Sequence, residues 1–440
     1  MKQFLQKTDF EEECNSFIEY IVENATIILN PHTVSWVTLS KEEYCIYCNL
    51  KMEQYIGDND AQKVVMKLIV NNIIRFKNNI HAPKIVPTPL NVYFAPTPRC
   101  NLHCVYCYAD AQPPTVEDEL MNDSEKAYKI LDNILSANIN TVYFTGGEPT
   151  LCKNLFHLVQ YVKDKGVNVS ILTNGTLINE NNVDKFKIFD KVTVSLDASV
   201  AEINDITRGK GSFDRIVPAI KLLKKNGIDV AVTSVISKNN LENVPNLLKF
   251  VRETLGVTQH KVSLYVSHGR AKANSDTMEC SYEEVIAFRR QYIEYLIKNR
   301  KPEEAIALFT PNIQKGMIRN LCGVASSEIF IDNKGFVYPC RLFETESHIL
   351  GNVSETPLAT VLQNKNTTCF KEKLCVDSIP ECNECEMKNL CGGGCRSSHS
   401  CYTEDIMKSH KHLCDIIKND IRSAILLNSG FNPITLKALR

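Results

Sequence analysis

The sequence predicts an α/β protein. Its centre is a partial (β/α)6 TIM-like barrel, preceded by a small α+β module and followed by a cysteine-rich domain. Three observations carry this prediction. The 440 residues suffice for two to four domains at roughly 150 residues each. Six β-rich segments alternate with segments of helical period in the middle of the chain. Eight of the 18 cysteines lie between Cys369 and Cys414, where that alternation has ended.

Composition limits the function before any motif is considered. The net charge is −1, so nothing in it favours binding to nucleic acid or to an anionic membrane surface. The start of the chain has no apolar segment of the kind a signal peptide needs, and no apolar run reaches the ~18 residues of a membrane span. We expect a cytoplasmic protein, in which clustered cysteines serve as metal ligands or catalytic groups rather than as disulfides.

Residues 1–85 are predicted to form the α+β module. "ATIILN" and "VSWVTLS" have the composition of strands, and Asn30-Pro31-His32 forms the turn between them. "KEEYCIYCNLKM" and "DAQKVVMKLIVNNIIRF" have the pattern of helices, and the proline-rich "HAPKIVPTP" is expected to be a linker. Cys45 and Cys48 lie three residues apart on the first of these helices, and we expect both to be buried core residues.

Residues 86–310 carry the alternation that defines the barrel. Strand–helix alternation implies parallel strands joined by right-handed crossovers, with the active site at their C-terminal ends. The expected strands are 91–97, 141–149, 168–175, 191–198, 229–236 and 261–271, and the expected helices are 124–138, 154–166, 182–189, 213–227 and 244–256. From residue 311 to 440 the rhythm gives way to cysteine, glycine and turn residues, which predicts a separate metal-stabilised domain.

Three cysteines directly follow the first barrel strand, in "RCNLHCVYC": Cys100, Cys104 and Cys107. Three thiolates can hold three irons of a 4Fe–4S cube and leave the fourth iron without a protein ligand. An open coordination position is typical of a catalytic metal site. The alternative is a structural zinc site completed by His103 or by another cysteine.

The triplet and the segments at the following strand ends resemble the radical S-adenosylmethionine (SAM) enzymes. "CNLHCVYC" resembles their CxxxCxxC signature, including the aromatic Tyr106. "GGEP" resembles their SAM-binding motif. "TNG" and the "SLDA" segment also occupy family positions, as does "HGRA" with Gly269 and Arg270. The resemblance implies that SAM contacts Tyr106, Gly146, Gly147, Glu148, Pro149, Asn174, Ser195 and Arg208, with Ser195 and Arg208 at its carboxylate.

This resemblance also implies a mechanism. SAM binds the open iron through its amino and carboxylate groups, and one electron from the reduced cluster cleaves it. The resulting 5′-deoxyadenosyl radical abstracts a hydrogen atom from the substrate, while the protein supplies position and excludes water. Flavodoxin or ferredoxin is the expected electron donor.

The tail resembles the SPASM domain of radical SAM peptide-modifying enzymes. That pattern is a cysteine, a glycine separated by four residues from a second cysteine, then CxxCx5CxxxC and one more cysteine. The resemblance implies two auxiliary 4Fe–4S clusters, three clusters in all, with the outer one held by Cys382, Cys385, Cys391 and Cys414. Cys322, Cys340 and Cys395 would hold the inner one, whose fourth ligand is Glu328, Cys375, Cys401 or the substrate. Zinc knuckles are the alternative for the CxxC pairs.

The N-terminal module resembles the winged-helix module that binds leader peptides, and the alternative is a plain cap on the barrel. The expected function is therefore modification of a ribosomally made precursor peptide with a leader, with a thioether or another crosslink as the product. A sulfatase-maturing enzyme is a second hypothesis. Its family carries an aspartate directly after the "YPC" cysteine, where this chain has Arg341, and an always-charged guanidinium cannot replace a carboxylate base. A zinc-stabilised peptide-binding protein without catalysis is the third.

Overall fold

The computed structural model describes residues 17–22, 24–52, 59–74, 89–115, 124–299 and 313–433. The chain divides into two compact units that are each built from separate stretches of sequence. Unit 1 comprises Met1–Pro87, Arg289–Cys322 and Leu374–Arg440, and unit 2 comprises Thr88–Phe288 and Gly323–Lys373. Residues 323–373 thus belong to the same unit as the barrel strands. The predicted domains 1–85, 86–310 and 311–440 stay a prediction about modules of sequence.

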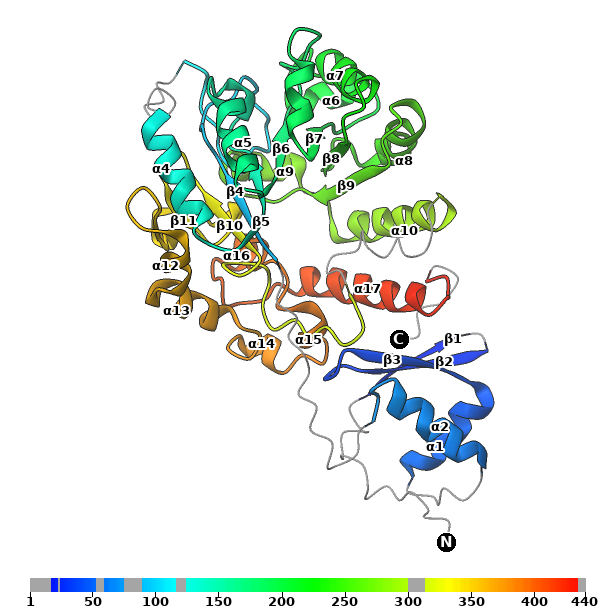
Figure 1. Ribbon diagram of the computed structural model, residues 1–440. Helices are drawn as coiled ribbons and strands as arrows, with labels where there is room; N and C mark the ends of the chain where they lie inside the picture. Colours follow the sequence, from blue (N-terminus) through cyan, green and yellow to red (C-terminus); the bar gives the residue numbers. More distant parts are fainter. Residues whose placement is uncertain are drawn as a thin grey trace. The chain divides into compact units, whose positions relative to one another are not determined.

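Unit 2 is built on a nine-stranded sheet with the order β12-β11-β10-β4-β5-β6-β7-β8-β9 (Figure 1). The six strands from β4 to β9 are all parallel, which confirms the predicted α/β class. A hairpin of β10 and β11 continues the sheet, because β10 pairs in parallel with β4. The strands are β4 Leu90–Phe94, β5 Ile139–Phe144, β6 Asn168–Thr173, β7 Lys191–Ser195, β8 Val230–Ile236, β9 Gln259–Leu264, β10 Glu328–Ile331, β11 Phe336–Tyr338 and β12 Gly351–Asn352.

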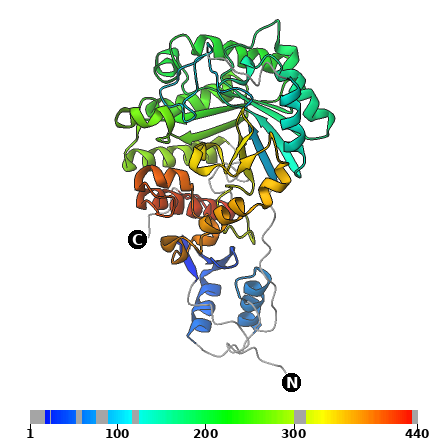
Figure 2. The same ribbon diagram turned by 90° about the vertical axis from the view of Figure 1, so that its left-hand side faces the viewer.

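The alternation of residues along each strand gives the sheet two different faces. On the outer face, Val92, Phe94, Val142 and Phe144 are fully buried in the main hydrophobic core. The helices that follow the strands cover this face (Figure 2). The residues in between point to the inner face of the barrel, and many of them are polar. This inner face and the strand ends are therefore the places where the barrel can bind a ligand.

The helices between β4 and β9 follow the predicted order with three differences, the first of which is that the expected helix 244–256 is an α-helix over Val244–Lys249 and a π-helix over Phe250–Thr254. Residues 182–189 were expected to form an α-helix, but Val183–Ile188 is a 3-10 helix. A further helix, α6, precedes α7 in the connection between β7 and β8. The α-helices of unit 2 are α4 Ser124–Leu135, α5 Leu155–Asp164, α6 Ala201–Arg208, α7 Phe213–Lys225, α8 Val244–Lys249, α9 Ser275–Met278, α12 Leu358–Gln363 and α13 Lys365–Leu374, while α10 Tyr282–Asn299 passes from this unit into unit 1.

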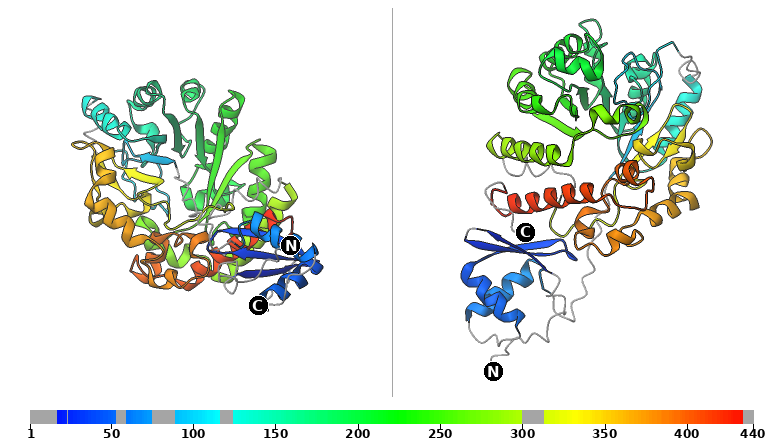
Figure 3. Two further views of the ribbon diagram at one scale, coloured as in Figure 1. Left: turned by 60° about the horizontal axis from the view of Figure 1, so that its bottom comes forward. Right: turned by 180° about the vertical axis from the view of Figure 1, so that it is seen from behind.

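The N-terminal module is a three-stranded antiparallel sheet with the order β1-β2-β3. Helices α1 Lys41–Lys51 and α2 Asn59–Val70 lie on one face of it (Figure 3). Strands β2 Ala25–Asn30 and β3 Ser35–Ser40 confirm the two predicted strands, and β1 Ile18–Val22 was not predicted. Ser40 starts α1 with a capping box to Glu43. The predicted linker 81–89 lies almost wholly outside the described residues.

The cysteines of this module differ from the expectation. Cys48 is half-buried and packs against the core between the sheet and its helices, as expected in kind. Cys45 is exposed, so it is no core residue. The side chain at the fifth position of α1 faces away from the sheet, because the helix buries only one stripe.

The rest of unit 1 consists of helices and cysteine-bearing loops. Its core joins Leu29 and Trp36 of the N-terminal sheet to Ile421 and Ile425 of the last helix. Its helices after α10 are α14 Pro380–Asn383, α15 Lys388–Cys391, α16 Arg396–Thr403 and α17 Lys411–Asn428. Among the described residues, no helix has the length and apolar character that crossing a membrane requires.

Candidate active site

The three cysteines predicted to bind a cluster share one loop that follows β4. The backbone of Cys100 donates a hydrogen bond to the carbonyl of Gln112, 2.8 Å, which closes the loop at its base. Burial raises the pKa of the Cys100 thiol to about 11 and that of Cys104 to about 12, and the neighbouring thiols of the triplet add to both shifts. The effect of Cys107 on both other thiols shows that the three sulfurs lie near one another, as the ligands of one iron–sulfur cluster must.

A segment after β9 holds the cysteine loop in place. A Cβ atom on Gly269 would lie 2.3 Å from the carbonyl oxygen of Tyr108, so only glycine permits this contact. The Arg270 guanidinium donates to the carbonyls of Cys104, 3.1 Å, and Ala111, 2.8 Å. The Asn274 amide donates to the carbonyl of Val105, 2.9 Å. The "HGRA" motif therefore shapes the backbone of the loop, a role that its position in the sequence did not reveal.

At the end of β5, the two glycines of "GGEP" likewise allow neighbouring backbone to come very close. A Cβ on Gly146 would lie 2.5 Å from the carbonyl oxygen of Thr97, and one on Gly147 would lie 2.1 Å from that of Arg99. The backbone amide of Gly147 donates to Thr97, 3.0 Å. The glycines thus bring the motif against the backbone that leads into the cysteine loop.

Glu148 links the ends of two neighbouring strands. Its side chain is 1% exposed, and burial raises the pKa of its carboxyl group. One oxygen accepts hydrogen bonds from Thr150 and from the Thr173 hydroxyl, 2.7 Å, and the other accepts from the backbone amide of Asn174, 2.7 Å. Pro149 is buried and begins the short 3-10 turn after Glu148. The Glu148 carboxylate is therefore fixed in orientation by its own protein partners.

Asn174 connects "TNG" to the cysteine loop. Its side-chain amide donates to the Asn101 side chain, 2.9 Å, and lies 3.8 Å from the Cys100 sulfur. Its side-chain oxygen accepts from Thr176. The ends of β4, β5 and β6 are thereby joined into one network, which brings together residues that the sequence placed at three successive strand ends.

A buried ion pair follows the end of β7. Asp197 is 0% exposed, and its carboxylate accepts a hydrogen bond from an Nη of Arg208, 2.9 Å, and lies 2.8 Å from the Arg208 Nε. The Tyr106 hydroxyl donates to the same carboxylate, and the Arg208 guanidinium lies 5.5 Å from the centre of the Tyr106 ring. In this structure Arg208 and Tyr106 therefore both bind the Asp197 carboxylate. Sequence analysis did not single out Asp197, although an acidic residue ending an apolar strand was the available signal.

Ser195 is the last residue of β7 and is half-buried. Its hydroxyl makes no hydrogen bond to any other described residue. Ser195 and Arg208 are the residues predicted to bind the SAM carboxylate, and of the two only Ser195 has a polar group that is not already bound to a described residue. Arg208 has two nitrogens occupied by Asp197.

The four cysteines predicted for the outer auxiliary cluster come together in unit 1. Burial raises the pKa of Cys391 to about 12, and Cys382 and Cys414 raise it further. The pKa of Cys414 is raised by burial and then by Cys382 and Cys385. Each of the four thiols therefore lies close enough to another to influence its charge.

The three cysteines predicted for the inner cluster are divided between the units. Cys322 and Cys395 belong to unit 1 and Cys340 to unit 2. Glu328 forms an ion pair with Arg341, 3.4 Å, and Cys401 lies 3.4 Å from the carbonyl of Ser397 in its own helix. In the described part of the chain, no three His, Cys, Asp or Glu side chains converge as the ligands of one ion would. Ligands of a 4Fe–4S cube each bind a different iron, so they need not converge on one point.

Comparison with protein families agrees with this geometry. Residues 94–251 match the model of the radical SAM superfamily. Residues 322–386 match the model of an iron–sulfur cluster-binding domain, SPASM. The first range takes in the cysteine loop, the Glu148 network and the Asp197 ion pair. The second takes in Cys322, Cys340, Cys382 and Cys385.

Two relatives illustrate the range of similar proteins. The chain is 24% identical over 351 residues to an AdoMet-dependent heme synthase of Methanosarcina barkeri, an alignment that covers 76% of this chain and 96% of that protein. It is 27% identical over 349 residues to the antilisterial bacteriocin subtilosin biosynthesis protein AlbA of Bacillus subtilis, covering 76% and 72%.

Two solved structures share the fold. The structure of native anSMEcpe with bound AdoMet and Cp18Cys peptide aligns with a TM-score of 0.59 at 20% identity, covering 78% of this chain and 98% of that one. The structure of Streptococcus suis SuiB bound to precursor peptide SuiA aligns with a TM-score of 0.55 at 17% identity, covering 90% and 96%. The chain belongs to the radical SAM superfamily and is a radical SAM enzyme that carries a SPASM domain.

Proposed function

We propose that this enzyme modifies a ribosomally made precursor peptide by radical chemistry, with a thioether or another crosslink as the product. The observation that carries the proposal is the single network at the ends of β4, β5 and β6. It fixes the cysteine loop, Glu148 and Asn174 relative to one another. Catalysis by a bound cofactor requires this kind of rigid positioning from the protein.

The residues at this edge of the sheet would hold the catalytic cofactors. Cys100, Cys104 and Cys107 would hold a 4Fe–4S cluster, and SAM would lie against "GGEP" and Ser195. SAM bound to a reduced cluster supplies hydrogen-atom abstraction from an unactivated carbon. The chain's own residues orient these groups, and the buried partners of Glu148 and Asp197 keep that orientation when the site fills.

We further propose two auxiliary clusters in the SPASM domain, which makes three in all. Cys382, Cys385, Cys391 and Cys414 would hold the outer one, and the mutual influence of their thiols supports this assignment. Cys322, Cys340 and Cys395 would hold the inner one. Its fourth ligand is Glu328, Cys375, Cys401 or the substrate itself. A flavodoxin or ferredoxin would deliver the electrons.

The N-terminal sheet would bind the leader of the precursor. Within the described residues, β3 pairs only with β2, so its other edge has no strand beside it. An extended peptide can add to such an edge through main-chain hydrogen bonds. SuiB, a structural neighbour with a bound precursor peptide, matches 90% of this chain, which supports a peptide substrate.

A tetrapyrrole substrate is the competing proposal, because heme synthases are among the relatives. The alignment to the Methanosarcina heme synthase takes in 96% of that protein but only 76% of this chain. About a quarter of this chain thus has no counterpart there. The alignment to AlbA also covers 76% of this chain, so the peptide substrate is favoured instead by the fold match to SuiB with its precursor peptide, which takes in 90% of the chain.

The test begins with the reading frames next to the gene. We expect a short precursor peptide among them. That peptide should be incubated anaerobically with reconstituted enzyme, SAM and dithionite, and followed by mass spectrometry. A loss of two hydrogens on formation of 5′-deoxyadenosine would indicate a crosslink, and isotope exchange from deuterated water would reveal epimerisation at unchanged mass. Conversion of iron-coproporphyrin with no change in the peptide would overturn the proposal in favour of the tetrapyrrole.

A further inference from the structure

A second group of charged side chains lies inside the barrel, away from the strand ends that form the cofactor site. Glu328 is the first residue of β10 and pairs in register with Asn91 near the start of β4. Lys261 is the third residue of β9 and pairs with Thr233 of β8. Their neighbours Ile329 and His260 are 0% and 4% exposed on the outer face. Because side chains alternate along a strand, Glu328 and Lys261 point to the inner face.

Arg341 joins this group from the turn after β11. Its Nε lies 3.4 Å from a carboxylate oxygen of Glu328, and both side chains are 29% exposed. Its guanidinium lies 4.6 Å from the centre of the Tyr93 ring, which stacks on Tyr143 at 4.8 Å. Arg341 is thus held by an aromatic wall on one side and a single, rather long ion pair on the other.

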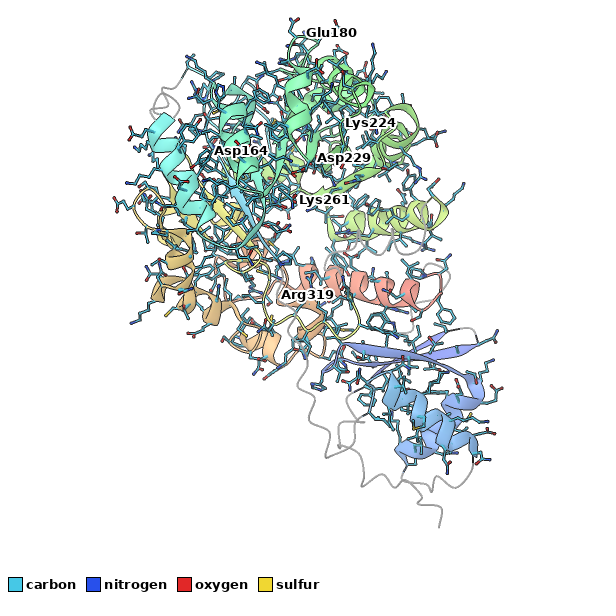
Figure 4. All side chains as sticks on the ribbon, viewed as in Figure 1. Asp164, Glu180, Lys224, Asp229, Lys261 and Arg319 are labelled. Carbon is cyan, nitrogen blue, oxygen red and sulfur yellow. The ribbon has the colours of Figure 1, made fainter. Side chains whose placement is uncertain are left out.

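Lys261 has no such support. Its side chain, labelled in Figure 4, is exposed, and it makes no ion pair or hydrogen bond to any other described residue. Although the side chain is exposed, the surrounding protein displaces water from its amine, and this desolvation lowers the pKa of the amine. The positive charge of Arg341 lowers the pKa further, whereas the negative charge of Glu328 raises it. Among the residues that the structure describes, Arg341 and Glu328 are the charged groups that shift this pKa. Lys261 therefore lies on the same inner face as Glu328 and within electrostatic reach of both Arg341 and Glu328.

Two cations and one carboxylate leave this group with an excess positive charge. A second carboxylate would neutralise it and would accept hydrogen bonds from both the guanidinium and the ammonium group. The residues predicted to bind SAM lie at the C-terminal ends of the strands, whereas Glu328 is the first residue of β10 and Lys261 lies within β9, so a carboxylate other than that of SAM is the expected partner.

We propose that Arg341 and Lys261 bind a carboxylate of the precursor peptide where the peptide enters the barrel, so that this enzyme selects an acidic position in its substrate. The inference rests on the proposed peptide substrate. The carboxylate comes either from an aspartate or glutamate side chain or from the C-terminus of the peptide. The stacked tyrosines would contact the apolar part of the same segment.

The experiment uses the full-length reconstituted enzyme and the precursor peptide from the neighbouring reading frame. Each acidic residue is replaced in turn by its amide, and a further peptide carries a C-terminal amide. KM and kcat for modification are measured, and binding of fluorescein-labelled peptides is followed by anisotropy, which does not require turnover. One replacement should raise KM roughly tenfold while changing kcat less, and it identifies the source of the carboxylate.

The variants Lys261→Gln and Arg341→Gln then assign the effect to the proposed pair. Each should reduce the roughly tenfold preference for the acidic peptide over its amide towards one. Lys261→Glu should prefer a peptide with lysine at that position, a reversal that misfolding cannot produce. The control Lys224→Gln changes an exposed lysine on α7, also labelled in Figure 4, and should retain the wild-type preference.

Failure of this inference is distinguishable from failure of the proposed function. If wild-type enzyme neither binds nor modifies any form of the peptide, the peptide substrate itself is wrong and the inference falls with it. If wild-type enzyme modifies the acidic and amidated peptides equally well, the inference alone is overturned. The same result follows if the two glutamine variants retain the full preference for the acidic peptide.

Discussion

The two cysteine regions of this enzyme differ in how closely neighbouring backbone approaches them. The loop with Cys100, Cys104 and Cys107 is held by side-chain donors from Arg270 and Asn274 and also by very close backbone approach, at Gly147 and Gly269. The tail region is fixed by side chains that reach into the backbone, and Arg396 is the main one. It is 1% exposed and donates to the carbonyls of Gly393, 3.0 Å, Ile406, 2.8 Å, and Lys408.

These supports predict which amino-acid substitutions each region tolerates. A contact that depends on the absence of a Cβ fails when any side chain is added. A loop held by a buried guanidinium fails when the donors are lost, because three carbonyls are left without a partner. Both regions are therefore sensitive to lost hydrogen bonds, and the first region, which has the closer backbone approaches, is the more sensitive to added volume.

The largest expected effect comes from the cysteines themselves, and it separates the two regions by function. Cys104→Ala should lower the rate of SAM cleavage at least about a thousandfold, because the cluster that would bind SAM loses a ligand. Cys414→Ala should leave SAM cleavage within about tenfold of wild type and should abolish modification of the peptide. 5′-Deoxyadenosine is measured by chromatography, and the product by mass spectrometry.

The control for this pair is Cys45→Ala, which removes an exposed cysteine far along the sequence from either region. It should retain the iron and sulfide content and both activities of wild type. Equal loss of SAM cleavage in Cys104→Ala and Cys414→Ala would show that the two regions do not differ in function.

The second effect is on stability in the tail. Arg396→Met should destabilise the segment 393–410 by about 3 kcal/mol, because the buried carbonyls lose their donors. Hydrogen exchange of peptides from this segment measures the change, with peptides from 100–112 as the internal reference. Lys411→Gln, at a side chain that is 85% exposed, should change exchange by less than about 0.5 kcal/mol. Equal exchange in Arg396→Met and wild type would refute the role given to Arg396.

The sequence predicted the cysteines of both regions but not these supports. Spacing along the chain marks ligands, since "CNLHCVYC" and "CNECEMKNLC" are local patterns. Arg270 and Asn274 hold the first loop from more than 150 residues away in sequence, and Asp197 receives Tyr106 from 91 residues away. A single sequence has no local signal for such contacts.

In the fold, too, pairing between distant segments could not be predicted from local sequence patterns. The six parallel strands were predictable because each has its own apolar run followed by a helical pattern, and the strand pairing confirms them. The extension of the sheet by β10, β11 and β12 was not predicted. These strands span only four, three and two residues, and β10 pairs with a strand more than 200 positions earlier.

The third effect tests the glycine contacts of the first region. Gly269→Ala should lower SAM cleavage by ten- to a hundredfold and reduce the iron content, because its Cβ would lie 2.3 Å from the Tyr108 carbonyl and displace the cysteine loop. Gly256→Ala is the matched control. It also has a positive φ, +64° against +55°, but its Cβ would meet nothing within 4 Å.

The control separates strain in the glycine's own backbone from pressure on the loop. Gly256→Ala should cost about 1 kcal/mol of stability and leave the rate of SAM cleavage unchanged. If both variants lose iron equally, positive φ alone explains the effect, and the close approach to the cysteine loop is not what matters.

The smallest effect is a pH dependence confined to the tail. His399 is 1% exposed, and its Nδ1 accepts a hydrogen bond from the backbone amide of His410, 2.8 Å. Burial lowers its pKa from 6.5 to about 4, and the charges of Arg396 and His410 add to the shift. In the unfolded chain His399 therefore binds a proton at a higher pH than in the folded chain. Its contribution to stability is complete above pH 6.5 and is lost as the pH falls towards 4.

Between pH 7.5 and 5.5 this lost contribution amounts to about 1 kcal/mol. Hydrogen exchange at the two pH values, corrected for intrinsic rates, should show that loss in peptides from 393–414 and not in those from 100–112. His399→Gln keeps a hydrogen-bond acceptor without the titration, so its tail should exchange with the same stability at both pH values. If the variant keeps the wild-type dependence, another group titrates in the tail. If the peptides of the cysteine loop respond equally, the two regions share one cooperative unfolding step, and the contrast between their supports does not extend to their stability.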